Sequence, residues 1–119
     1  MHELGIIEEM VKLAVHEIER AGATEPVTCI TLTVGKLSGA SPEALRTAFE
    51  IVSPQTRLRG ADLVIHEPGA FCHCQECGRE TEVDGYLFAC PHCGSGSIVL
   101  EGGNQLQLAS IDLDDEQGE

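Results

Sequence analysis

The sequence predicts an α+β fold, with a small three-stranded sheet and two helices in one domain and a cysteine-rich insertion in another. Helix-like and strand-like spacings of apolar residues alternate along the first part of the chain. The composition then changes between Cys72 and about Gly103, where cysteine, glycine and polar residues dominate, and a strand pattern resumes afterwards. A chain of 119 residues has room for one ordinary domain with a small module attached.

The first helix is expected between Glu3 and Arg20. Apolar residues recur there at spacings of three and four, which gives one buried stripe and leaves charged residues for solvent. The stripe contains Leu4, Ile7, Val11, Ala14 and Ile18. Gly22 follows at the position where a glycine commonly ends a helix.

The remaining elements of this domain are one more helix and three strands. Residues 27–35 alternate between apolar and polar side chains, as in a half-buried strand. Ser41 is a suitable N-cap and Pro42 fits the first position of a second helix. Strands are also expected in residues 61–67 and 104–113. A three-stranded sheet covered by two helices is the economical arrangement, although the strand order stays open.

The formal net charge of −13, from 20 acidic and 7 basic side chains, argues against two classes of partner. Such a chain repels the phosphates of nucleic acids and anionic lipid surfaces. No apolar run approaches the ~20 residues that span a bilayer, and acidic residues interrupt the apolar runs near the N-terminus. We therefore expect a cytoplasmic protein without nucleic-acid or membrane partners. In that compartment the six cysteines are more often metal ligands or free thiols than disulfides.

Four of the cysteines form two CxxC pairs, with twelve residues between the pairs and a glycine after each. They are Cys74, Cys77, Cys90 and Cys93. A CxxC turn directs both sulfur atoms to one side, and two such turns complete a tetrahedron around an ion that is most often zinc. A redox dithiol and an iron–sulfur site are the alternatives, and spacing alone does not exclude iron. Four thiolates leave no position for water, which favours a structural zinc in a zinc-ribbon-like domain.

Three residues beside these pairs each allow two interpretations. Cys72 is interpreted as a spare thiol, because the two CxxC pairs already satisfy zinc, although it could serve as an alternative ligand. His73 and His92 are interpreted as ordinary solvated side chains. The sharper hypothesis is that these histidines replace thiolates at the metal when conditions change.

The first three residues, Met1, His2 and Glu3, predict a second kind of metal site. The large side chain of His2 should protect Met1 from removal. The terminal amine, backbone amide nitrogens and the imidazole can then close adjacent chelate rings around one cation. Deprotonated amides suit Ni(II) or Cu(II), and Glu3 could add an oxygen or orient the ring. A histidine without function at this position is the plainer alternative.

The whole chain resembles the HypA/HybF family of hydrogenase maturation proteins. The resemblance rests on four stretches: MHE at the start, VGKLSGASPEAL, the spaced CxxC pairs and IDLD near the end. It implies nickel at His2, with Glu3 contributing, and structural zinc at the four paired cysteines. It also implies a metallochaperone that works with the GTPase HypB and delivers nickel to the large subunit of [NiFe]-hydrogenase, and in some organisms also serves urease. Some relatives have an acidic residue near position 41 that assists at nickel, where this chain has Ser41 and Pro42.

These inferences divide the chain into a nickel-binding domain, residues 1–69 and 105–119, and a zinc-binding domain, residues 70–104. No enzymatic activity is expected, since the sequence has no recognisable nucleophile–base pair or phosphate-binding glycine loop. Nickel affinity should fall as the pH drops through about 6 to 7, because an imidazole must be neutral to bind a metal. The alternative function is a zinc-ribbon module for protein–protein interaction, without nickel transfer.

Overall fold

A computed structural model of the chain describes residues 2–114, which divide into two compact units. The first unit consists of the described residues within 1–32, 40–65 and 107–119, and the second consists of residues 33–39 and 66–106. Each unit has its own three-stranded sheet, and the helices belong to the first unit. The α+β fold with two helices that the sequence predicts is confirmed.

Helix α1 spans Glu3–Ala21 and ends as the sequence predicts. Gly22 adopts a left-handed conformation with φ of 70°, and its N–H donates to the carbonyl of Glu19. The N–H of Ala23 donates to the carbonyl of Ile18, so two carbonyl groups near the end of the helix are satisfied. The buried face of α1 consists of Ile7, Met10, Val11, Ala14 and Ile18.

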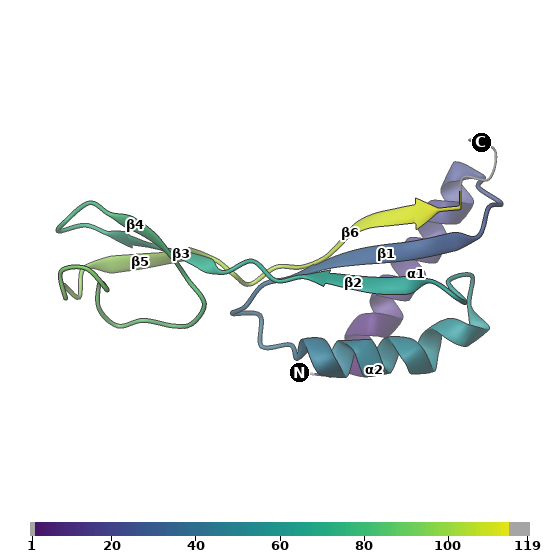
Figure 1. Cartoon of the computed structure of the whole chain (residues 1–119), viewed down its shortest axis with the longest axis horizontal. Coiled ribbons are helices and arrows are strands. Elements are labelled where there is room, and N and C mark those ends of the chain that lie inside the picture. The colour runs from purple at the N-terminus through teal and green to yellow at the C-terminus, as the bar shows by residue number, and fades with distance from the viewer. Residues whose placement is uncertain (1, 115–119) are drawn as a thin grey trace. The chain divides into compact units, whose positions relative to one another are not determined.

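The first unit is built around strand β1, Val27–Val34, which lies at the centre of its sheet. Strand β2, Asp62–His66, pairs with one edge of β1, and strand β6, Leu106–Leu113, pairs with the other (Figure 1). Ile30 and Leu32 are buried on one face of β1, whereas the intervening Thr31 is half-buried. The strand order β2-β1-β6, which the sequence left open, places the chain's last strand beside its first.

Helix α2 spans Pro42–Val52 and continues into a short 3₁₀ turn. It begins at the predicted cap, because the Ser41 hydroxyl oxygen accepts a hydrogen bond from the Ala44 N–H at 3.2 Å. Helix α2 packs against α1. Its apolar residues face the core over most of the helix, and Val52 is half-buried at the end. The buried residues are Leu45, Ala48 and Phe49.

The sheet of the second unit contains three strands that the sequence analysis did not predict. They are β3, Ala70–Cys74; β4, Glu80–Val83; and β5, Ile98–Gly102. Strand β3 lies in the centre and pairs antiparallel with both neighbours. The three strands are only four or five residues long and include cysteine, glutamate and glycine, so they lack a strong apolar alternation.

Residues 33–39 lie in the second unit because their backbone is hydrogen-bonded to residues on either side of its sheet. The N–H of Gly35 donates to the Gln105 carbonyl at 2.8 Å, and the N–H of Lys36 donates to the Pro68 carbonyl at 2.9 Å. A side chain on Gly35 would overlap the backbone of Gly103. Glycine is therefore required at position 35 for this close approach of two chain segments.

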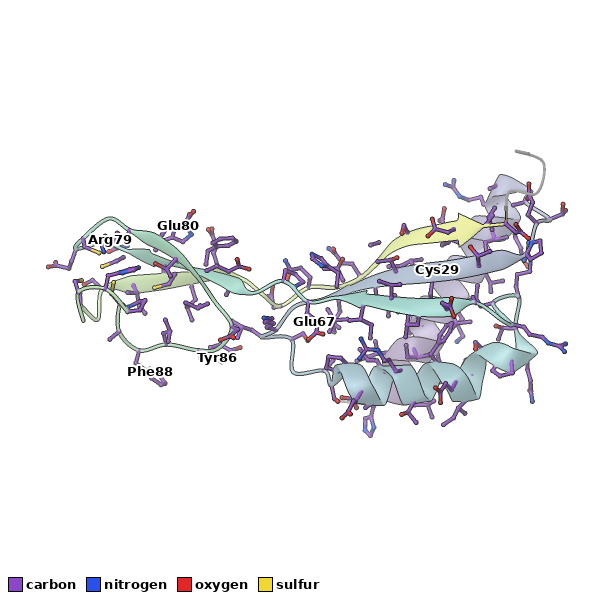
Figure 2. All side chains as sticks on the ribbon, in the orientation of Figure 1. Cys29, Glu67, Arg79, Glu80, Tyr86 and Phe88 are labelled. Carbon is purple, nitrogen blue, oxygen red and sulfur yellow. The ribbon has the colours of Figure 1, made fainter. Side chains whose placement is uncertain are left out.

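Two aromatic side chains of the second unit are largely exposed. Tyr86 and Phe88 lie in the segment between β4 and β5, and 93% of the Phe88 surface is accessible to solvent (Figure 2). The cysteine-rich unit thus buries little of its few aromatic side chains, in agreement with the small core expected of it.

Candidate metal centre

The first CxxC pair forms a tight turn at the end of β3. The N–H of Cys74 donates to the Arg79 carbonyl at 3.0 Å, and the N–H of Gly78 donates back to the Cys74 carbonyl at 3.0 Å. Gly78 adopts a φ of 76°, which a glycine tolerates best. The turn aims the backbone N–H groups of Glu76 and Cys77 at the Cys74 sulfur, each at 3.4 Å.

The second CxxC pair repeats this turn. The N–H of Cys90 donates to the Ser95 carbonyl at 2.8 Å, and the N–H of Gly94 donates to the Cys90 carbonyl at 2.9 Å. Gly94 has a φ of 80°, and the N–H of His92 points at the Cys90 sulfur at 3.3 Å. The two glycines that follow the pairs in the sequence therefore serve the same purpose in both turns.

The two turns bring four sulfur atoms together, all within 4.8 Å of one another. The Cys74 and Cys93 sulfurs are 3.6 Å apart, and those of Cys77 and Cys90 are 3.8 Å apart. A tetrahedron with zinc–sulfur bonds of about 2.3 Å has edges of about 3.8 Å. The cluster therefore fits zinc by its donor atoms and by its size. In the described part of the chain, it is the one group of three or more potential His, Cys, Asp or Glu ligands that converge in this way.

Hydrogen bonding and burial shift the pKa values of three of the four thiols. The Cys77 N–H lowers the pKa of Cys74, and the Cys93 N–H lowers the pKa of Cys90 to about 6. At Cys93, the Ser95 N–H acts in the same direction, but burial and hydrogen bonds to the other thiols raise the pKa to about 12. The lowered pKa of the first cysteine in each pair favours the thiolate, the form that binds a metal.

Cys72 lies close to the cluster in sequence but its sulfur is not part of it. The side chain is 1% exposed, and burial raises the pKa of its thiol. In the register of the sheet, Cys72 lies opposite Thr81 on β4 and Leu100 on β5. It is a buried thiol of the sheet, in agreement with the interpretation as a spare thiol.

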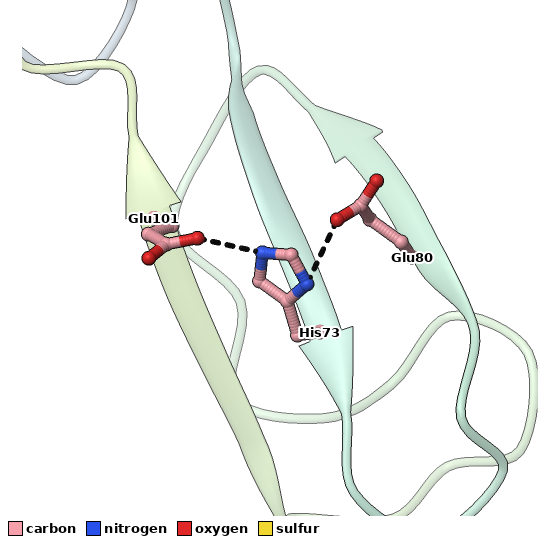
Figure 3. A network of polar contacts seen from close by, with 3 residues as sticks. All are labelled: His73, Glu80 and Glu101. Atoms are coloured by element: carbon pink, nitrogen blue, oxygen red, sulfur yellow. Dashed lines mark hydrogen bonds and ion pairs between the residues drawn. The ribbon is translucent and has the colours of Figure 1, made fainter.

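The two histidines beside the cysteines have partners of their own. Strand alternation places His73 on the face opposite Cys72 and Cys74, and Figure 3 shows its ring between two carboxylates. The Nδ1 atom is 3.0 Å from Glu80, and the Nε2 atom is 2.9 Å from Glu101.

The His92 ring is likewise engaged, since its Nε2 atom is 2.8 Å from the Thr81 hydroxyl. Neither histidine belongs to the sulfur cluster. Exchange of a histidine for a thiolate would require these contacts to break.

His2 stands at the beginning of α1, as the residue before the first helical turn. Its side chain is exposed, and its carbonyl accepts the Ile6 N–H at 3.1 Å. The first N–H groups of a helix have no acceptor within the helical ladder. The Glu3 N–H lies close to the carboxylate of its own side chain and helps to lower the pKa of that group. Met1, whose amine the sequence suggests as a further ligand, lies outside the described residues.

Glu3 makes a contact that the sequence does not reveal. Its Oε2 atom accepts a hydrogen bond from the Ser41 N–H at 2.9 Å, although 38 positions separate the two residues. This hydrogen bond lowers the pKa of the Glu3 carboxyl group. No periodicity or short motif indicates such a pair, because it depends on how α1 and α2 pack.

A hollow of about 330 Å³ lies beside the start of α1. It is lined by His2, Glu3, Leu4, Ala44, Thr47, Ala48 and Ile51. Leu4 and Ile51 are both exposed, so the imidazole borders an accessible, partly apolar surface of the first unit.

Fold and site together define a class, a small α+β metal-binding protein with one four-sulfur cluster and an exposed histidine at its first helix. Residues 1–113 match the family model described as "Hydrogenase/urease nickel incorporation, metallochaperone, hypA". The chain belongs to this family. It is therefore a nickel metallochaperone of hydrogenase maturation, an accessory factor and not an enzyme, which agrees with the resemblance seen in the sequence.

Relatives named "Hydrogenase maturation factor HypA" match almost the whole chain. The protein from Chlorobium luteolum is 40% identical over 116 residues, which cover 98% of each chain. The protein from Bradyrhizobium sp. is 35% identical over 114 residues, covering 96% of this chain and all of the relative.

Two solved structures share the fold. One is described as the solution structure of the Ni metallochaperone HypA from Helicobacter pylori, with a TM-score of 0.65 and 19% identity over 95% of this chain and 97% of that one. The other, described as the solution structure of HypA protein, has a TM-score of 0.68 and 19% identity over 98% of both chains. Among the described residues, no helix is both long and apolar enough to cross a membrane.

Proposed function

We propose that this chain binds Ni(II) at its N-terminus, through His2 with Glu3 contributing, and delivers it to the large subunit of [NiFe]-hydrogenase. In this proposal Cys74, Cys77, Cys90 and Cys93 hold a structural zinc. The observation that carries it is the exposed position of His2 at the start of a helix in a chain of the nickel-incorporation family. The corresponding domains are residues 1–69 and 105–119 for nickel and residues 70–104 for zinc.

The helix start suits a metal that must be passed on. Nickel can take the amide nitrogens of His2 and Glu3 without breaking a hydrogen bond within α1, because these groups precede the helical ladder. Glu3 contributes either through this amide nitrogen or through its carboxylate. Ligands on an exposed chain end can be exchanged one at a time for those of an acceptor, which makes release possible without unfolding.

The four-cysteine site suits a metal that stays in place. Four sulfur donors complete the tetrahedral sphere of zinc and leave no open position for a substrate or water. When bound, zinc would supply cross-linking between the two turns of a unit whose own core is small. The reduced thiols that such a site needs agree with the expected cytoplasmic location.

The proposed partners are the GTPase HypB and the precursor of the hydrogenase large subunit, with urease maturation proteins as further candidates. The exposed acidic side of α1 near the nickel terminus is the proposed docking surface for HypB. Glu8→Lys should then weaken HypB binding, whereas Glu19→Lys at the other end of the helix should not. Unchanged affinity in Glu8→Lys, with folding preserved, would move the docking surface elsewhere.

The deciding experiment is nickel calorimetry on zinc-loaded, untagged protein. His2→Ala should abolish tight nickel binding, whereas His16→Ala, which removes an exposed histidine from the same helix, should retain it. Zinc content must be equal in all samples. Equal nickel binding in wild type and His2→Ala would reject the proposed terminus and leave the alternative, a zinc-ribbon module for protein interaction without nickel transfer.

A further inference from the structure

The Glu3 carboxylate occupies a place where two helices begin. Glu3 lies in the first turn of α1, and its Oε2 atom accepts the N–H of Ser41, the N-cap residue of α2. The N-terminus of a helix carries a partial positive charge that attracts a carboxylate. Both helices therefore favour a negative charge at this point, and the 2.9 Å hydrogen bond fixes it there.

This hydrogen bond also fixes the backbone that carries the proposed nickel ligands. The peptide bond between His2 and Glu3 joins the residue that carries the imidazole directly to the amide nitrogen of Glu3. A Cβ atom added to Gly5 would lie 3.9 Å from the His2 Cβ atom, so the His2 side chain begins close to the first turn of α1. Because the Glu3 carboxylate is attached to Ser41, this short stretch is held against α2 and not left as a loose chain end.

A positioning role predicts a different chemistry from a ligand role. A carboxylate that binds nickel contributes an oxygen to the metal and must share or leave the Ser41 amide. A carboxylate that stays on Ser41 acts only through the geometry of the backbone. Groups that orient metal ligands from outside the coordination sphere commonly contribute 10–100-fold to metal affinity.

We propose that Glu3 is a positioning residue, whose carboxylate stays hydrogen-bonded to the Ser41 amide with and without nickel and holds the terminus ready to bind the metal. This inference rests on the proposed nickel site and specifies how Glu3 serves it: the side chain gives its oxygen to Ser41, and only the backbone of Glu3 is offered to nickel.

Four variants separate the two roles. Glu3→Gln keeps a carbonyl oxygen that can accept the Ser41 N–H but removes the carboxylate as a ligand, whereas Glu3→Ala removes both. Ser41→Pro removes the N–H donor and leaves the carboxylate free, at a residue whose φ of −90° is close to the proline range. Ser41→Ala is its matched control, because it removes the same side-chain cap and keeps the N–H.

We expect nickel affinity in Glu3→Gln to stay within about twofold of wild type. Glu3→Ala should lose about tenfold against wild type, and Ser41→Pro should lose about tenfold against Ser41→Ala. Glu3→Ala and Ser41→Pro each remove one partner of the same hydrogen bond. The double variant Glu3→Ala/Ser41→Pro should therefore bind nickel no more weakly than the double variant Glu3→Ala/Ser41→Ala. Equal losses in Glu3→Gln and Glu3→Ala, with Ser41→Pro matching Ser41→Ala, would overturn the proposal in favour of a carboxylate ligand.

Nickel X-ray absorption gives a readout that a merely structural role would not move. The spectrum should be the same in wild type and Glu3→Gln, and altered in Glu3→Ala and Ser41→Pro, where the terminus is no longer held. A spectrum that loses an oxygen ligand in Glu3→Gln would contradict the proposal.

The hydrogen bond itself can be followed without nickel, by the amide NMR signal of Ser41 during an acid titration of the zinc-loaded protein. The signal should shift as Glu3 takes up a proton, and this shift should be absent in Glu3→Gln. An unresponsive Ser41 signal in wild type would overturn the inference. His2→Ala provides the remaining distinction: retained nickel binding in that variant defeats the proposed nickel terminus, whereas lost binding together with a ligand-type pattern at Glu3 defeats only the positioning role.

Discussion

Backbone N–H groups hold side chains in place both at the four-cysteine cluster and at the start of α1, but more of them do so at the cluster. In the cluster, two complete turns aim N–H groups at sulfur, and each turn is closed by further hydrogen bonds of its own backbone. At the helix start, one N–H from Ser41 holds one carboxylate, and the imidazole of His2 remains exposed. The donor atoms of the cluster are therefore fixed by more backbone contacts than the imidazole of His2, which agrees with the proposed division between a retained zinc and a transferred nickel.

The largest effect is expected from removing a cysteine of the cluster. Cys90→Ala should abolish zinc retention and strongly destabilise the second unit, since structural zinc contributes on the order of 10–16 kcal/mol in small zinc domains. Zinc content and an NMR spectrum of each unit measure this. Cys29→Ala, which removes the half-buried thiol of β1 (Figure 2), should keep its zinc. If Cys90→Ala still bound zinc with wild-type affinity, the cluster would not be the zinc site.

A smaller effect is expected in the number of protons that zinc binding releases. At pH 7 zinc binding to the folded second unit should release fewer than four protons, because the lowered pKa of Cys90, about 6, leaves that group already a thiolate. The same shift stabilises the metal-free fold at pH values above the ordinary thiol pKa of 9.0, and this contribution is lost as the pH falls towards 6. Calorimetry in buffers of different ionisation enthalpy counts the protons. A release of four would mean that the N–H groups do not favour the thiolate.

Near the start of α1, the Ser41 cap of α2 should contribute to the free energy of unfolding by the amount that is usual for a helix cap. Ser41→Ala should lower the free energy of unfolding of the zinc-loaded protein by about 1 kcal/mol, because the Ala44 N–H loses its acceptor. Ser41→Asn, which can cap a helix equally well, should restore most of this loss. Denaturant unfolding measures both. A loss in the asparagine variant as large as in the alanine variant would point to another function of the serine hydroxyl.

The smallest effect is expected at the exposed aromatic of the second unit. Phe88→Ser should change stability by less than about 0.5 kcal/mol and leave zinc affinity unchanged, because the side chain is 93% exposed and buries little surface. Thermal unfolding and a zinc competition assay check this. A substantial loss of stability would show that the ring packs on the unit in solution.

Local signals in the sequence were sufficient for much of the fold. The limits of α1 followed from the apolar spacing and Gly22, the start of α2 from Ser41 and Pro42, and the convergence of the four sulfur atoms from the CxxC spacing. Each depends on residues a few positions apart, where geometry is fixed by helix or turn periodicity.

The features that the sequence missed depend on contacts between distant segments. The hydrogen bond between Glu3 and Ser41 exists because two helices pack, and no pattern in either segment announces it. The order of the strands around β1 is equally invisible, since either edge of a central strand could take the last strand. The short strands β3 to β5 are held by pairing with one another. Ile98, Val99 and Leu100 form a strand-type apolar run on β5 that the sequence analysis passed over, whereas the cysteines and glutamates of β3 and β4 gave a weaker signal.

The position of β6 in the first sheet has a consequence for how the protein is made. Residues 106–113 are synthesised after all four paired cysteines, so the first unit cannot complete its sheet until the cysteine-rich segment has been made. Domains generally fold as units while synthesis proceeds. The order of the segments thus makes the edge strand of the first sheet one of the last parts of the fold to be added.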